Sequence, residues 1–387
     1  MKRDNRHLLC ACLAGFAFSV NYTNHAPLAA TLMRQFDFTK TMAGFLTTGI
    51  FATHALMQIP AGYLADNFGG KKILVWALAI VCIGNVGIAF SANYEQLLLW
   101  KIFVGFGTGA SFVGGARYIA QAMPAERLYQ AQGFYGASVL LGSGFVIFAV
   151  PRLANAFGWP VSFLSTAFIA VCAVVVWVFA VPSPEFKSRL PVKLQSLLSD
   201  KQLWLLGFLQ MASFGLLILT GTWIIELLKK QNGLSITNAG AIGSLVLLLG
   251  IFTRIYGARL VIRLGYKATL VLSMLLNVAG CFILASALSS IYITLLAISC
   301  IGVGSGLPYS ALFSRAVNLF PGRAGTAMGL VNMLGIIMIL IGAPLIGKIT
   351  DITGSFSAAF VALGLFALIA MLAAFGIKNN NIQQVNK

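Results

Sequence analysis

Asn21, Asn24 and His25 bring polar and titratable chemistry into an otherwise apolar stretch near the start of the chain. Their i, i+3 and i+4 spacing places all three on one face of a helix. A further cation, Lys101, stands in a later apolar stretch. An imidazole and an ammonium that address one cavity would attract an anion. We therefore expect Asn21, Asn24, His25 and Lys101 to bind substrate or to couple its movement to another ion.

Two structural roles compete with that hypothesis. The ammonium of Lys101 could extend to the nearby end of its helix, and His25 could be a core histidine bonded to a carbonyl. His54 and Gln58 share a helix face at i and i+4, and we expect interhelical hydrogen bonds from them rather than substrate contacts.

Carboxylates are missing from the middle of every apolar run, and the nearest is Glu226, towards the end of its run. A carrier of cationic drugs is expected to hold a buried acid, so this pattern favours an anionic solute. Among the other polar residues within apolar runs, we expect Gln210, Trp223 and Asn332 to line a cavity.

The elements that position these residues must lie in a lipid bilayer. Of the 387 residues, 59% are hydrophobic and 9% are charged, whereas a soluble domain has about 25% charged residues. The net charge of +17 is scattered over the ends of apolar runs, which does not suit a nucleic-acid-binding surface. All six cysteines fall in apolar runs, without the spacing of a disulfide framework or a metal site. We expect neither a metal nor a cofactor.

Twelve apolar runs are long enough to cross the hydrocarbon layer, which takes about 20 residues. They cover residues 8–32, 41–64, 73–91, 95–119, 129–152, 161–181, 203–228, 236–258, 268–287, 290–314, 325–349 and 355–376. We interpret the first run as a span rather than a signal peptide, because eleven more follow it. The predicted fold class is an all-α membrane protein, since a β-barrel would show short alternating segments instead.

Lysine and arginine are distributed unequally between the two sides of the membrane. With the N-terminus inside, 19 of them fall on the cytoplasmic side and 6 on the outer side, while Lys101 lies within a helix. The positive-inside rule then places both termini in the cytoplasm, and we expect a bacterial inner (plasma) membrane. Arg254, which has Tyr256 and Arg259 beside it, is assigned to the basic cytoplasmic rim.

The second half of the chain repeats the first. A shift of 196 residues aligns Gly69 with Gly265 and Gly158 with Gly354, and a shift of 197 aligns the glycines of the fourth and tenth runs. Two parallel repeats imply a pseudo-twofold axis along the membrane normal, with a binding site between the halves. The longest polar interval separates the repeats. We predict an N-terminal six-helix bundle, a cytoplasmic linker, and a C-terminal six-helix bundle with a short polar tail, over residues 1–181, 182–202 and 203–387.

The stretch "GYLADNFGGKK", between the second and third runs, resembles the loop signature of the major facilitator superfamily, G-x-L-A-D-R-x-G-R-K/R. Gly62, Asp66, Gly69 and Lys71 match it, while an asparagine and a glycine stand where the family often has arginine. "KIFVGFG" is similar to the family's fourth-helix pattern R-x-x-x-G-x-G, with lysine in place of arginine. "NYTNHAPLAATL" is similar to the N-Y-x-x-R stretch of the organic-anion branch, with His25 at the arginine position.

A carboxylate at the cytoplasmic mouth of helix two can act as a latch. We expect Asp66 to pair with Arg117 and to face the positive N-terminal end of helix eleven near Gly325, contacts that exist only when the halves close on the inside. The alternative is a solvated loop acid, and the second repeat holds Ile262 at the corresponding position. The expected latch comprises Gly62, Asp66, Gly69, Lys71 and Arg117.

The repeat and the resemblance together predict a secondary active transporter that works by alternating access. We expect a small anionic solute, symport with H⁺ as the coupling ion, and a monomer. An exporter of apolar or drug-like compounds is the first alternative, although the fifth helix lacks the Gly-Pro pair that drug antiporters carry. A non-transporting membrane receptor is the second. A membrane enzyme is not expected, since the chain has neither a soluble catalytic domain nor a phosphate-cradling loop.

Overall fold

The computed structural model describes residues 3–182 and 194–378. All regular elements in these ranges are helices, which confirms the predicted fold class. Eleven helical segments of this part of the chain are long and apolar enough to cross a membrane. The remaining crossing, at the N-terminus, is divided between a helix of 20 residues, Arg3–Tyr22, and a helix of 8 residues, Ala29–Phe36. Large apolar side chains such as Trp76, Phe179 and Tyr292 are more than 70% exposed, as expected of a surface that faces lipid.

The N-terminal half supplies the first six crossings. Its helices are α1 (Arg3–Tyr22), α2 (Ala29–Phe36), α3 (Lys40–Phe68), α4 (Gly70–Ala89), α5 (Tyr94–Ala122), α6 (Ala125–Phe157) and α7 (Trp159–Phe179). Much of the predicted linker, residues 183–193, lies outside the described residues, as does the polar tail from residue 379.

The C-terminal half begins after a short linker helix, α8 (Leu194–Leu198). Its helices are α9 (Lys201–Gln210), α10 (Leu216–Asn232), α11 (Ile236–Gly243), α12 (Leu245–Leu264), α13 (Tyr266–Ala285), α14 (Ile291–Gly306), α15 (Tyr309–Leu319), α16 (Ala324–Thr353) and α17 (Ser357–Ala374). A π-helical turn at Met211–Gly215 joins α9 to α10. Such turns inside helices are frequent at functional sites.

The first crossing is discontinuous, so the single run predicted over residues 8–32 is corrected. α1 ends at Tyr22, a 3-10 turn covers Ala26–Leu28, and α2 starts at Ala29. Pro27 accounts for the break, because its nitrogen has no hydrogen to donate and its ring clashes with the carbonyl four residues earlier.

The positive φ angles of the backbone recur at the spacing of the predicted repeat. Three pairs of residues that lie 196 positions apart share a positive φ: Gly69 and Gly265, Gly158 and Gly354, and Asp37 and Gly233. The first two pairs were predicted from the glycine alignment. The third was not, because one of its members is not a glycine.

The two halves pack through two equivalent interfaces, α3 against α16 and α12 against α6. A Cβ added at Gly329 would meet the backbone of Gln58, and one added at Gly133 would meet the carbonyl of Arg254. Gly133 and Gly329 are 196 residues apart, and so are Gln58 and Arg254. The pseudo-twofold axis therefore relates Gln58 on α3 to Arg254 on α12.

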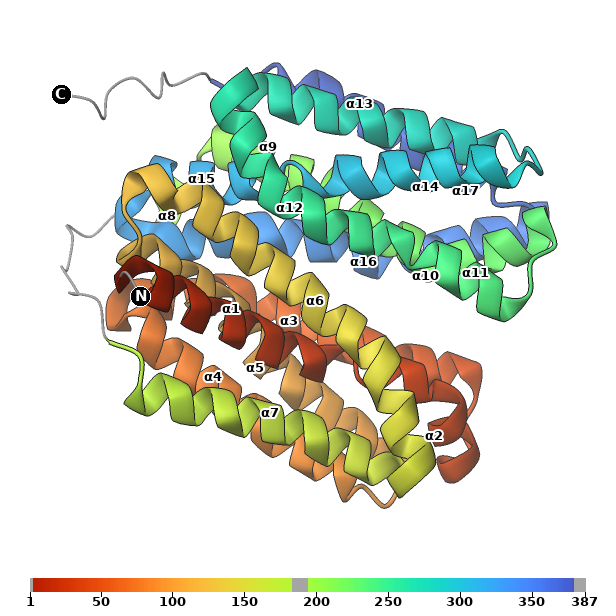
Figure 1. Cartoon of the computed structure of the whole chain (residues 1–387), viewed down its shortest axis with the longest axis horizontal. Helices are drawn as coiled ribbons and strands as arrows, with labels where there is room; N and C mark the ends of the chain where they lie inside the picture. Colours follow the sequence, from red (N-terminus) through yellow and green to blue (C-terminus); the bar gives the residue numbers. More distant parts are fainter. Residues whose placement is uncertain (1–2, 183–193, 379–387) are drawn as a thin grey trace.

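Figure 1 shows the two halves close together at the end that carries α8 and the start of α1, and diverging towards the end that carries α2. We call these the α8 end and the α2 end. A central cavity lies between the halves and is lined by residues of both.

Candidate functional site

The central cavity is small and has a different character on its two sides. It offers about 20 Å³ to the centre of a water-sized molecule, which is room for about one water. The N-terminal half contributes mainly aromatic rings, those of Phe18, Tyr22, Phe51 and Phe112, together with His54. The C-terminal half contributes most of the polar groups.

Arg254 is the charged residue of this cavity. Its side chain lies in the middle of α12 and is 2% exposed. Its Nη1 donates to the carbonyl of Gly136 at 2.7 Å, and its guanidinium lies 4.3 Å from the centre of the Tyr309 ring. Arg117–Asp66 and Arg127–Asp4 are ion pairs within residues 3–182 and 194–378, whereas Arg254 pairs with no carboxylate there.

The assignment of Arg254 to the cytoplasmic rim was wrong. α12 continues for ten residues beyond Arg254 to Leu264, which is about 15 Å at the rise of an α-helix. The predicted run ended too early, at residue 258, and so placed a central cation at the edge. Arg254 lies 196 residues after Gln58, which was predicted to face a neighbouring helix. That equivalence in the repeat could have placed Arg254 inside the bundle.

Further polar atoms of the C-terminal half lack partners at the cavity. Within the described residues, Nε2 and Oε1 of Gln210, the Tyr309 hydroxyl and Nε of Arg254 have no hydrogen-bond partner. A buried polar group left unpaired costs about 1–3 kcal/mol. Three of these four atoms can donate, so the cavity is suited to a ligand that accepts hydrogen bonds.

Two polar contacts lie beside the cavity, one between the halves and one within the N-terminal half. Nδ2 of Asn332 on α16 donates to Oε1 of Gln58 on α3 at 3.1 Å. Nδ1 of His54 lies 3.0 Å from the Thr108 hydroxyl on α5. His54 thus makes the interhelical hydrogen bond predicted for it and also lines the cavity.

Asn24 contacts Lys101 and shares a neighbour with Asn21 inside the N-terminal half, away from the central cavity. Nδ2 of Asn21 donates to the carbonyl of Thr166 on α7 at 3.0 Å, and Nδ2 of Asn24 donates to the hydroxyl of the same threonine at 2.9 Å. Nζ of Lys101 donates to Oδ1 of Asn24 at 2.6 Å. The ammonium therefore points into the bundle instead of extending to the surface, and Lys101 is 0% exposed.

His25 and Trp223 also lie apart from the cavity. His25 follows the end of α1, and its Nε2 lies 2.9 Å from the Thr47 hydroxyl on α3. Trp223 on α10 packs against Phe356, with 6.0 Å between ring centres. Of the residues predicted to line a cavity, Gln210 and Asn332 line the central one.

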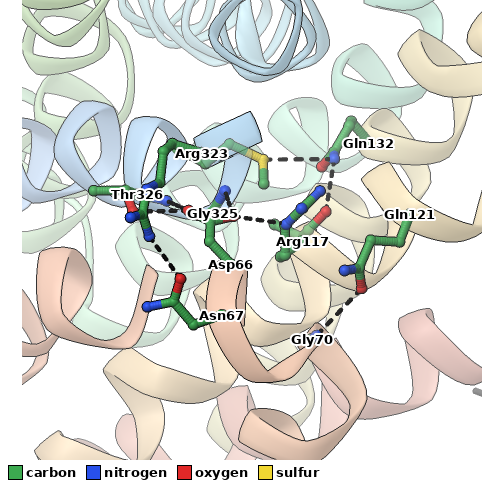
Figure 2. Close-up of polar contacts among 11 residues, drawn as sticks. Asp66, Asn67, Gly70, Arg117, Gln121, Gln132, Arg323, Gly325 and Thr326 are labelled. Carbon is green, nitrogen blue, oxygen red and sulfur yellow. Dashed lines mark hydrogen bonds and ion pairs between the residues drawn. The ribbon is translucent and has the colours of Figure 1, made fainter. Parts of the chain in front are cut away.

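Asp66 lies at the α8 end, where it joins the two halves (Figure 2). Its Oδ1 is 2.7 Å from Nε of Arg117 and accepts from the amide of Gly325 at 2.8 Å. Its Oδ2 accepts from the amide and the hydroxyl of Thr326 at 2.9 and 2.7 Å. The carboxylate thus occupies the N-terminal end of α16, where the helix dipole and free amides favour a negative charge.

The other predicted latch residues have different positions. A Cβ added at Gly62 would come within 2.6 Å of the Gly325 carbonyl, so glycine lets α3 and α16 approach there. Gly69 ends α3 with a φ of 91°. Nζ of Lys71 donates to the carbonyl of Val181 at 2.5 Å, which ties it to the end of α7 rather than to Asp66.

Two comparisons place this architecture among known proteins. A family model described as Major Facilitator Superfamily matches residues 11–335 and 203–384. A protein named probable nitrate transporter NarT, from Staphylococcus epidermidis, is 24% identical over 377 residues and covers 96% of both chains.

Solved structures share the fold at low sequence identity. The proton:xylose symporter XylE has a TM-score of 0.83 and 15% identity, with 97% of this chain and 96% of that chain covered. The human organic anion transporter MFSD10 has a TM-score of 0.81 and 16% identity, with 97% and 100% covered.

Proposed function

This chain belongs to the major facilitator superfamily, and we propose that this multi-pass membrane transporter moves a small inorganic anion across the membrane by alternating access, in symport with H⁺. The substrate that we propose is nitrate or an anion of similar size and charge. The α8 end faces the cytoplasm of a bacterial cell in this proposal, and the transporter works as a monomer in the inner membrane.

The buried guanidinium of Arg254 in the central cavity is the main observation that supports the proposal. A buried guanidinium without a carboxylate is costly unless a counter-charge reaches it. Arginine also presents a planar fork of donors that matches an oxoanion. The Gln210 amide and the Tyr309 hydroxyl face the same cavity with free hydrogen-bonding capacity, so one small acceptor could satisfy several of these groups together.

The size of the cavity and the relatives support a small ion over a larger organic acid. The space between the halves has room for about one water, so it must widen even for nitrate, and a larger organic acid would require more widening between the aromatic rings. The curated relative from Staphylococcus epidermidis is named a probable nitrate transporter.

The contacts of Asp66 support alternating access. Its carboxylate binds α16 of the other half, so these bonds must break before the α8 end can open. We propose that Gly62, Asp66 and Arg117 hold the cytoplasmic side shut while the anion is exchanged with the outside.

Purified transporter in proteoliposomes tests the function by nitrate counterflow. We expect Arg254→Gln to abolish nitrate exchange, because the charge and the donor fork are both lost. Arg259→Gln is the matched control, since Arg259 lies on the same helix but is exposed. Counterflow that survives Arg254→Gln, or wild-type protein that exchanges no small anion, would overturn the proposal.

An exporter of apolar compounds remains the second candidate, because the N-terminal side of the cavity is largely aromatic. A thermal-shift screen of nitrate, other anions, carboxylates and drug-like cations distinguishes the two. Stabilisation by hydrophobic compounds but not by anions would favour the exporter. Binding of nitrate without counterflow would favour a receptor.

A further inference from the structure

We propose that Lys101, with Asn24 and His25, forms the proton-binding site of this transporter, separate from the anion cavity and located at the break in the first crossing. This inference rests on the proposed H⁺ symport and names the place where the coupled proton is held. The central cavity contains Arg254, which stays protonated in proteins and therefore cannot serve as a proton carrier.

The Lys101 cluster is polar, closed and built from four crossings. Oδ1 of Asn24 accepts from Nζ of Lys101 at 2.6 Å, while Nδ2 of Asn24 donates to Oδ1 of Asn85 at 2.8 Å and to the hydroxyl of Thr166 at 2.9 Å. The Phe163 ring centre lies 5.3 Å from Nζ. Asn24 thus connects the ammonium on α5 to both α4 and α7.

The ammonium of Lys101 has little to balance its charge. It carries three N–H donors, and the described residues supply it with one hydrogen bond, to Asn24, and no carboxylate. A buried charge that no opposite charge compensates is costly, and lysine, unlike arginine, can become neutral. Lys101 can therefore exist in both protonation states within the fold.

His25 is the titratable neighbour of this cluster. It follows Asn24 directly, is 4% exposed, and its Nδ1 has no partner within the described residues. Ala26, the next residue, is exposed at the surface. We expect a proton that enters at the α2 end to reach Lys101 by way of the imidazole, and positive charges on these two groups would repel each other.

The other helices packed around Lys101 add no further charge to the cluster. α3 brings Thr47 and, two turns further along, His54, which bonds to Thr108. α4 brings Asn85, and α7 brings Phe163 and Thr166. The charged residues that α5, α6 and α16 carry near the α2 end are exposed to the surroundings: Glu95, Arg152, Lys348 and Asp351.

Protonation at this place has a mechanical consequence. A charged ammonium makes a stronger hydrogen bond to Asn24 than a neutral amine does. Asn24 lies between the end of α1 at Tyr22 and the 3-10 turn at Ala26–Leu28. The protonated lysine therefore holds the joint of the first crossing against α4, α5 and α7, and loss of the proton releases that joint.

Lys101→Arg tests the site, because arginine keeps the charge and the donors but does not release a proton. We expect the variant to keep nitrate counterflow, which needs only the protonated, loaded carrier. We expect it to lose the accumulation of nitrate that an inward pH gradient drives. In the wild type, each coupled proton should raise the ratio of internal to external nitrate about tenfold per pH unit. Lys229→Arg, at an exposed lysine, is the control that should keep both.

Accumulation that persists in Lys101→Arg would overturn the proposal. Loss of counterflow in a folded variant would also overturn it, because Lys101 would then belong to the anion path. Wild-type accumulation that ignores the pH gradient would do the same.

Hydrogen exchange supplies a readout that does not need transport. Histidine and perturbed lysines titrate between about pH 5 and 9. Over this range we expect the amide hydrogen-exchange rate of residues 20–30 in the wild type to change more with pH than the intrinsic rate of unprotected amides does. In Lys101→Arg it should follow the intrinsic rate. Equal pH profiles for the two proteins would overturn the inference, even if nitrate proves not to be the substrate.

Discussion

Arg254 and Lys101 are two buried cations that differ in what surrounds them. Arg254 faces the cavity between the halves, beside free donors on Gln210 and Tyr309. Lys101 is enclosed within one half and bonded to Asn24. A cation at a cavity can attract a ligand, while a cation in a closed network can only exchange its proton. The proposed division of work between anion and proton follows from this difference.

Gly136 controls how Arg254 and Tyr309 fit together. Its carbonyl accepts from Arg254, and a Cβ added there would overlap the Tyr309 ring. Overpacking of this kind costs about 1–3 kcal/mol. We expect Gly136→Ala to displace the ring from the guanidinium and to weaken nitrate binding by about tenfold or more.

Thermal shift against nitrate concentration measures that effect. Gly144→Ala on the same helix is the control, because a Cβ added at Gly144 meets nothing within 4 Å. Equal nitrate affinity in the two variants would show that the position of the Tyr309 ring does not matter for binding.

Helical periodicity predicted that Asn21, Asn24 and His25 share one helix face, but α1 ends at Tyr22, so Asn24 and His25 lie beyond the helix. Asn21 and Asn24 contact one neighbour, Thr166 on α7, whereas His25 contacts Thr47 on α3. Their separation from the central cavity depends on the packing of α7 in the bundle, which no local pattern reports. Arg254 was placed at the cytoplasmic rim for a related reason. Counting lysines and arginines near the ends of apolar runs does not show how far a helix continues beyond the run.

At the scale of elements, the N-terminal end of α16 is the part of the closing interface that can be broken by one change. Asp66 is buried and satisfies the amides of Gly325 and Thr326 as well as Arg117. Removing one partner from a buried ion pair costs about 3–5 kcal/mol. We expect Asp66→Asn to shift the population towards forms that are open at the α8 end.

Spin labels at Lys72 and Arg263, one exposed residue on each half, report that opening through their distance distribution. Asp4→Asn is the control, because Asp4 pairs with Arg127 inside the first half and its side chain is 38% exposed. The latch role would fail if Asp66→Asn and Asp4→Asn gave the same distribution as the wild type.

The break in the first crossing illustrates what a hydropathy profile conceals. Residues 8–32 form one apolar run, yet Pro27 ends the regular helix within it. The composition of the run is compatible with a continuous helix, and proline is tolerated in spanning helices whose freed backbone groups find other partners. Pro60, Pro151 and Pro344 lie inside continuous helices, so a proline in an apolar run does not by itself show that the helix breaks there.

At the scale of the whole molecule, orientation follows from charge. We expect the α8 end to lie in the cytoplasm, because most lysines and arginines gather there. A membrane-impermeant maleimide should then label Ser289→Cys in intact cells but not Arg263→Cys, two exposed positions on opposite ends. Arg263→Cys should react after the membrane is opened. The reverse pattern would invert the proposed topology.

The repeat was largely predictable, because paired glycines 196 residues apart mark equivalent turns. What distinguishes the halves was harder to foresee. Gln58 and Arg254 occupy equivalent positions, and so do Asp66 and Ile262, yet one member of each pair is charged and the other is not. The two halves share one arrangement of helices, while the charged residues at which they differ are those to which we assign a function.

The departure at Ile262 has a kinetic consequence. Ile262 is 69% exposed and offers no carboxylate to the opposite half, so the two orientations of the empty carrier differ in free energy. If the transporter alternates as proposed, we expect the unloaded protein to rest mainly in one orientation and its return to be the slow step of the cycle. Trading one bound anion for another avoids that return, so tracer exchange should outpace net flux.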